Sequence, residues 1–317
     1  MGRICVGTNS IMRDVKLWRM AWVRGVLLAL LGVSAAWADV VSDVVAAASH
    51  NNFIAAQALL QQARAAGETP QTVLALSWMA RYALSFRQYA QAEGYARDTY
   101  QRAVQQLKKR PLDLEPNLPL ALGAAIEVQA MLLAVKGQRT EAIAYLDEQR
   151  KLYAGTSIVT RIQKNVNLLS LVGKPAPALK AVALPAGKPA LLFFWAHWCT
   201  DCRAEAPLLA KLKSEFGPKG LAFVGITQKY GYVGGGDDAP PSVELRYIEQ
   251  IRQRYYSQIV SAPATVSEAS FQTYGVSTTP TLAAVDGRGI VRLYHPGAMT
   301  EPELRAAIQT VLAGSAQ

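Results

Sequence analysis

The hydrophobic pattern of this chain changes at one point, the sequence Gly173-Lys174-Pro175-Ala176-Pro177. Before it, from residue 39 to about 168, apolar residues recur at three- and four-residue spacings, the period of a helix that buries one face. After it, short apolar runs alternate with helical patterns, which is typical of an α/β domain. We therefore expect two parts of different class in the 317 residues, consistent with a usual domain size of roughly 100–200 residues.

The first part is expected to be helical throughout. Alanine, leucine, glutamine, glutamate and arginine dominate its composition, and glycine and proline separate its periodic stretches. The predicted helices span residues 40–49, 52–66, 71–85, 88–109, 119–136, 139–154 and 157–169.

Three segments of this part resemble one another. They begin at Asn52, Gln88 and Gln138, and in each a polar turn precedes an aromatic or long side chain and then an alanine-centred apolar face. Stacked helical hairpins need such a face, and tetratricopeptide-type repeats have a period of about 34 residues. Because the intervals between the three segments are unequal, a hairpin array of this type and a plain helical bundle both remain open.

The second part is expected to be an α/β domain of alternating strands and helices. The sequence Asp286-Gly287-Arg288-Gly289 predicts the turn of a hairpin. The predicted strands span residues 190–195, 221–227, 281–285 and 290–294, and the predicted helices span 199–216, 242–256, a short segment ending at 271–274, and 301–312.

The first 38 residues have the layout of a secretory signal peptide. Basic residues within 13–24 precede an apolar stretch over 25–36, and Ala36-Trp37-Ala38 supplies a small-x-small cleavage site. About a dozen apolar residues are too few to span a bilayer, which takes roughly 20. We therefore predict cleavage after Ala38, no stable membrane span in the mature chain, and a periplasmic or otherwise exported protein. An uncleaved anchor helix is the alternative.

The charge of the chain gives no reason to expect a nucleic-acid partner. The formal net charge is +10, from 33 basic and 23 acidic residues, but the first 38 residues hold five of the bases and one of the acids. The remaining 28 basic and 22 acidic residues leave a mild +6. Their signs alternate, and the short basic run Lys108-Lys109-Arg110 is typical of a solvated helix end.

Two cysteines, Cys199 and Cys202, stand where an apolar strand gives way to a helix, whereas Cys5 precedes the signal and should be lost with it. The N-terminus of a helix carries partial positive charge and free N–H groups, which stabilise a thiolate. Only a thiolate attacks a disulfide, and a second thiol one turn further can resolve the mixed disulfide. We expect Cys199 to be the exposed nucleophile and Cys202 the more buried resolving thiol.

Other interpretations of this spacing fit the sequence less well. A zinc site needs about four ligands, and beyond the two cysteines there are only the scattered His50, His197 and His295. A purely structural disulfide across so small a loop would add little stability. The glycines within 231–236 are not followed by Gly-Lys-Ser/Thr, so a phosphate-binding loop is rejected. No metal and no other cofactor are expected.

The sequence Phe194-Trp195-Ala196-x-Trp198-Cys199-x-x-Cys202-Arg203 resembles the active site of the thioredoxin superfamily. Pro207 falls where that family has a helix-kinking proline, and Thr279-Pro280-Thr281 resembles the segment with its cis-proline. The resemblance covers about residues 171–313. The Gly173–Pro177 segment, the export signal and an insertion before Tyr274 make it nearest to exported TlpA/ResA-like disulfide reductases.

The resemblance and the helical pattern together imply an α/β thioredoxin-like domain, with a central mixed sheet flanked by helices, preceded by an all-α helical-hairpin domain. The expected boundaries are 1–38 for the signal peptide, 39–169 for the helical domain and 170–317 for the thioredoxin-like domain. The implied site residues are the catalytic Cys199 and Cys202 and the substrate-binding Trp198, Thr279 and Pro280. The implied partners are exported proteins with disulfides and a membrane electron donor.

The chain departs from the family where a proton must be transferred. Thioredoxins keep a buried acid six residues before the first cysteine, and here that position is Phe193. Glu205 and Asp201 are candidates to replace it, although acids on a helix are more often solvated. His197 is expected to line the rim of the site, and the glycine-rich residues 231–238, which begin an insertion at about 228–260, to form a mobile loop beside it.

These features favour an exported thiol–disulfide oxidoreductase that reduces protein disulfides. A peroxiredoxin-type peroxide reductase shares the fold but uses a Pro-x-x-x-Thr-x-x-Cys motif that is absent here. A scaffold, in which the helical part binds a partner and the second part only delivers it, is a third possibility. An oxidase or an isomerase also remains open.

Overall fold

The computed structural model describes residues 39–182, 184 and 187–314. All of them belong to one compact unit. The predicted signal peptide and its cleavage site lie outside the described residues. The domain boundary between residues 169 and 170 stays a prediction.

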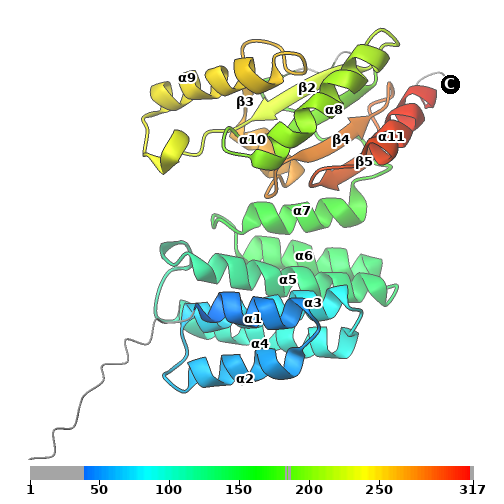
Figure 1. Cartoon of the computed structure of the whole chain (residues 1–317). Helices are drawn as coiled ribbons and strands as arrows, with labels where there is room; N and C mark the ends of the chain where they lie inside the picture. The colour runs from blue at the N-terminus through cyan, green and yellow to red at the C-terminus, as the bar shows by residue number, and fades with distance from the viewer. Residues whose placement is uncertain (1–38, 183, 185–186, 315–317) are drawn as a thin grey trace, which may run out of the picture. The chain divides into compact units, whose positions relative to one another are not determined.

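Helices fill the first part of the described chain, as predicted (Figure 1). They are α1 (Val40–Ser49), α2 (Phe53–Arg64), α3 (Pro70–Ser85), α4 (Tyr89–Leu107), α5 (Asn117–Val135), α6 (Arg139–Leu152) and α7 (Val159–Ser170). A short turn, η1 (Leu112–Leu114), which the sequence pattern did not predict, precedes α5. Each helix contacts the next one, and α1, α3, α5 and α7 also contact one another in sequence. This is the contact order of stacked helical hairpins.

The three similar sequence segments begin with the same turn. The residue before each segment has a positive φ, which is 61° at Asn51, 60° at Arg87 and 82° at Gly137. The next amide then donates to a carbonyl five residues back, in the pairs Asn52–Ala47, Gln88–Ala83 and Gln138–Leu133, at 3.0, 2.8 and 2.9 Å. Such a bond caps the C-terminus of the preceding helix. The sequence similarity thus corresponds to a shared connection from α1 to α2, α3 to α4 and α5 to α6.

The central helix α5 is apolar on most sides because it contacts α3, α4, α6 and α7. By length and composition it could cross a membrane, but more than half of it is buried in the protein. Its Glu127 accepts hydrogen bonds from Arg161 Nε at 3.1 Å and Lys164 Nζ at 3.0 Å, both on α7. Burial would raise the pKa of Glu127, but the cations Arg161, Lys164 and Arg81 lower it to about 2.

The second part is built on a mixed five-stranded sheet with the order β3-β2-β1-β4-β5. The strands are β1 (Ala190–Phe194), β2 (Ala222–Thr227), β3 (Thr265–Val266), β4 (Thr281–Val285) and β5 (Val291–Pro296). β1, β2 and β3 run parallel, whereas β4 is antiparallel to both β1 and β5. The sequence pattern predicted each strand except β3, which has only two residues.

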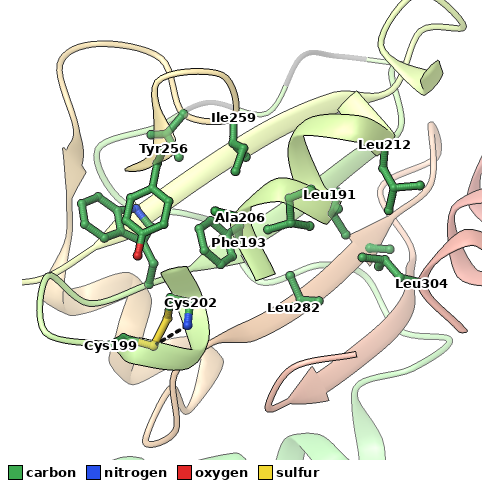
Figure 2. Packing of buried hydrophobic residues seen from close by; sticks show 14 of the residues in the cluster. Leu191, Phe193, Cys199, Cys202, Ala206, Leu212, Tyr256, Ile259, Leu282 and Leu304 are labelled. Carbon is green, nitrogen blue, oxygen red and sulfur yellow. Dashed lines mark hydrogen bonds between the residues drawn. A yellow bond between two sulfur atoms is a disulfide. The ribbon is translucent and has the colours of Figure 1, made fainter. Parts of the chain in front are cut away.

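Helices cover both faces of this sheet, because all five residues of β1 are buried and successive side chains point to opposite faces. Leu191 and Phe193 share a core with α8 (Thr200–Phe216) and α11 (Glu301–Ala313) (Figure 2). Leu192 and Phe194 point to the other face and share a core with α10 (Glu268–Tyr274). The fold class is therefore the predicted one, an all-α part followed by a thioredoxin-like α/β part.

The two parts are joined through α7 and α10. The Asn167 side chain donates to the Thr273 carbonyl at 3.3 Å. Gly275, which ends α10 with φ of 62°, lies so close to α7 that a Cβ there would overlap the backbone of Lys164. Leu171, just after α7, already belongs to the core beneath the sheet.

Candidate functional site

The two cysteines lie where β1 leads into α8. All five residues of β1 are buried, and α8 begins at Thr200 with Cys199 as its N-cap. The Cys202 N–H donates to Cys199 Sγ at 3.0 Å, shown as the dashed line in Figure 2. The predicted placement of Cys199 at a helix N-terminus is confirmed, and its sulfur occupies the position where a thiolate is best stabilised.

Cys199 and Cys202 form a disulfide, with their Cα atoms 5.3 Å apart. Cys199 is 2% exposed and Cys202 is fully buried. The expectation of an open nucleophile is therefore wrong for the disulfide form, because both cysteines pack within the core that contains Trp195 and Tyr256 (Figure 2). The exposed residue beside them is Trp198, at 45%.

The Thr279–Pro280 peptide bond is cis, as the resemblance implied. Thr281, the next residue, pairs with Phe194 at the end of β1. This register brings Pro280 level with the start of the loop that carries Trp198 and the cysteines. The Thr279 hydroxyl is buried and has no hydrogen-bond partner among the described residues. Substrate binding by Trp198, Thr279 and Pro280 stays a prediction.

The position of the thioredoxin acid is apolar, and a different acid lies near the disulfide. Phe193 packs edge-on against Tyr256, with ring centroids 5.7 Å apart. Glu205, one turn beyond Cys202 on α8, is 5% exposed. It was expected to be solvated, but α8 buries it against the loop before α11, where Oε1 accepts the Met299 N–H at 2.9 Å.

The environment of Glu205 favours its protonated form. Burial, and to a smaller extent the charge of Asp201, raise the pKa of Glu205 to about 7, against the opposing Met299 hydrogen bond. Its second carboxylate oxygen, Oε2, has no partner among the described residues. Glu205 also lines a cleft of about 260 Å³ together with Asp201 and Met299. A carboxyl that titrates near neutral pH beside a thiol pair can accept and release a proton there.

The insertion lies between β2 and β3 and contains the predicted helix. After an exposed turn, η2 (Gly234–Gly236), it forms α9 (Pro241–Ile251), which continues as the wider turn η3 (Arg252–Tyr256). The helix predicted at 242–256 is thereby confirmed. The chain returns to the sheet at β3, and Tyr256 packs on Trp195 with ring centroids 4.7 Å apart.

The sequence predicts His197 at the rim of the site. In the structure its side chain is instead buried, with 1% of its surface exposed. The insertion covers it, because the rings of Tyr230, Tyr232 and Tyr247 all meet the imidazole edge-on. Glu244, also 1% exposed, lies 3.3 Å from His197 Nε2. The sequence analysis did not identify Glu244. It shares the apolar face of α9 with Ile248 and Ile251, and an acid at this helical spacing among apolar residues could have indicated a buried carboxyl group.

The chain is similar in sequence to known thiol:disulfide interchange proteins. A model of the AhpC/TSA family matches residues 172–232, which include both cysteines. The thiol:disulfide interchange protein DsbE of Xylella fastidiosa is 30% identical over 155 residues, which are 45% of this chain and 71% of the relative. The thiol:disulfide interchange protein HelX of Rhodobacter capsulatus is 28% identical over 174 residues, 51% of this chain and 89% of the relative.

Among solved structures, a putative thiol:disulfide interchange protein DsbE from Chlorobium tepidum is 25% identical to this chain. The match covers 44% of this chain and 97% of that protein, with a TM-score of 0.32.

Proposed function

Because the chain belongs to the thioredoxin superfamily of thiol–disulfide oxidoreductases, we propose that it acts outside the cytoplasm as a reductant of disulfides in other exported proteins. The observation that favours reduction over oxidation is the presence of two acids beside the cysteine pair. Asp201 stands between the cysteines, and Glu205 is buried one turn further along α8. Negative charge at Asp201, and at Glu205 once its proton has left, opposes a thiolate, and what destabilises the reduced form makes a dithiol a stronger reductant.

In the proposed reaction the reduced chain gives two electrons to a partner disulfide. The Cys199 thiolate attacks one partner sulfur, so a mixed disulfide forms and the other partner sulfur leaves as a thiolate. Cys202 loses its proton to Glu205 and attacks Cys199 Sγ, which releases the second partner thiolate and closes the Cys199–Cys202 disulfide. A membrane dithiol donor then returns two electrons to the pair.

The equilibrium between the cysteine pair and glutathione tests the direction of electron flow. We expect a reduction potential near that of thioredoxin, ~−270 mV, rather than near the ~−120 mV of a strong oxidant. A value close to the oxidant would reverse the proposed direction. Turnover of hydrogen peroxide, measured in the same preparation, would favour the peroxide-reducing alternative.

The roles of the two cysteines are tested by trapping. Cys202→Ser removes the resolving thiol and should accumulate partner proteins linked to Cys199 on a non-reducing gel. Cys199→Ser should abolish both turnover and adducts. If Cys199→Ser accumulates adducts and Cys202→Ser does not, the two roles are exchanged.

Export is proposed from the signal-like N-terminus, and it would place the cysteine pair in a compartment where partner proteins carry disulfides. Cleavage after Ala38 would leave Asp39 as the first residue, the one that caps α1 by accepting the Val41 N–H at 3.2 Å. The intact mass of the exported protein should therefore equal that of a chain whose first residue is Asp39. A mass that includes residues 20–38 would contradict cleavage.

A further inference from the structure

Glu244 is a buried acid whose bonds lie within the insertion and the active-site loop. Its two carboxylate oxygens accept the backbone N–H groups of Tyr230 and Gly231, the latter at 2.9 Å. Oε1 also lies 3.3 Å from His197 Nε2. Glu244 on α9 thereby holds the start of the insertion and, through His197, the residue two positions before Cys199.

His197 is held from a second side as well. The Arg203 guanidinium, on α8, donates to the His197 carbonyl at 2.6 Å. The three tyrosine rings stand 5.3–5.4 Å from the imidazole, centroid to centroid, and Tyr230 also meets the ring of Trp198 at 5.5 Å. Burial lowers the pKa of His197, although Glu244 opposes this. A neutral imidazole with its proton on Nε2 donates to Glu244.

A packed core does not need this pair. Burying a carboxylate and an imidazole costs free energy that apolar side chains of similar volume would avoid. The surroundings are aromatic, so a phenylalanine at position 197 could fill the same space. The polar pair therefore has a purpose other than packing, and the segment it touches carries Trp198 and Cys199.

We propose that Glu244 is a positioning residue for the Cys199–Cys202 reaction, acting through His197. It fixes the 196–198 segment at the N-terminus of α8, and its charge disfavours accumulation of the Cys199 thiolate, so the disulfide form is favoured. The inference rests on the proposed function for the direction of electron flow, from the cysteine pair to a partner disulfide. The reaction it influences is the exchange already described, in which the dithiol is oxidised and a partner disulfide is reduced to two thiols.

The test is the equilibrium constant for oxidation of the full chain by glutathione disulfide, together with the rate of insulin reduction. Glu244→Gln removes the charge and one of the two N–H acceptors. The constant should fall about three- to tenfold, as expected for a unit charge lost near the thiolate, and insulin reduction should slow. His197→Phe fills the space between the three tyrosine rings but donates no hydrogen bond to Glu244, and it should shift the constant in the same direction.

Three further variants separate positioning from general stability. His197→Gln restores a donor and should recover most of what His197→Phe loses. The double variant of Glu244→Gln and His197→Phe should change the constant no further than the larger single effect, because the two residues act as one unit. Glu249→Gln is the matched control, since Glu249 lies on the same helix and accepts the Ala264 N–H at 3.0 Å. It should leave the constant unchanged.

The outcomes are distinguishable from failure of the proposed function. If Glu244→Gln and His197→Phe lower the unfolding midpoint but leave the glutathione constant unchanged, Glu244 is structural only and the inference is overturned. The glutathione constant can be measured whichever way electrons flow. A wild-type chain that proves to be an oxidant would therefore overturn the proposed function, while a Glu244-dependent constant would still support positioning.

Discussion

The proposed proton acceptor is Glu205, whose folded-state pKa is raised by burial to about 7. The folded chain therefore binds this proton more tightly than the unfolded chain does. The resulting stability is complete below the ordinary pKa of about 4.5 and is lost as the pH rises through about 7. Glu205→Gln, which stays neutral, removes this dependence.

We predict that the free energy of unfolding of the wild type, relative to Glu205→Gln, falls by up to about 3 kcal/mol between pH 4.5 and 8. Urea denaturation of both oxidised proteins across this range measures the difference. Insulin reduction at pH 7 should also slow at least about tenfold in the variant, because the proton acceptor for Cys202 is gone. A difference in stability that does not vary with pH would contradict the assignment.

The residues of the site differ in how far the sequence predicts them. Cys199 and Cys202 could be identified because their chemistry depends on local spacing and on the start of one helix. The burial of His197 could not, because it depends on the insertion folding back over a loop more than thirty residues earlier. Glu205 was named as a candidate, but its burial arises from the Met299 segment, almost a hundred residues later.

At the scale of the elements, the contact between α7 and α10 depends on Gly275. An alanine there would have to keep a φ of 62° and would also overlap the backbone of Lys164. We predict that Gly275→Ala lowers the free energy of unfolding by about 2–4 kcal/mol, from backbone strain and overpacking together. Chemical denaturation measures it.

Gly289→Ala is the matched control for this prediction. Gly289 has a comparable φ of 79°, but a Cβ there would meet nothing within 4 Å. Only the strain remains, so the loss should be about 1 kcal/mol. Equal losses in the two variants would show that the approach of α7 to Gly275 contributes nothing.

The elements themselves were largely predictable, because helices and buried strands follow local hydrophobic periodicity. The strand Thr281–Val285 was predicted with its observed limits, and the helix predicted at 301–312 differs by one residue from α11. The two-residue β3 and the turn η1 are too short to show a period. β3 forms only because the end of the insertion pairs with β2.

At the scale of the whole molecule, the sequence predicts two parts but not the contact between them. The change in pattern at residues 173–177 follows from local composition. The packing of α7 against α10 does not, since it joins segments about a hundred residues apart and shows in the sequence only as a glycine at position 275. Helix α7 therefore belongs to both parts: Ile162 lies in the helical core, and Asn167 bonds to α10.

The last prediction concerns the division of labour between these parts. The proposed chemistry uses Cys199, Cys202, Glu205, His197 and Glu244, all beyond residue 170. A fragment of residues 157–317, which keeps α7 against α10, should reduce insulin within about threefold of the full chain, because the reacting groups and their supports are intact. A fragment of residues 170–317, which loses this helix, should unfold at a lower urea concentration.

We predict that partner recognition belongs instead to the hairpins before residue 157. The Cys202→Ser change, placed in the full chain and in the 157–317 fragment, should trap exported partners at least about tenfold less in the fragment, because only the recognition surface has been removed. Quantitative mass spectrometry of the adducts gives the ratio. Equal trapping by the two proteins would show that the helical part does not contribute to partner recognition. A folded fragment that cannot reduce insulin would place part of the chemistry in the helices, since every group proposed to react is still present in it.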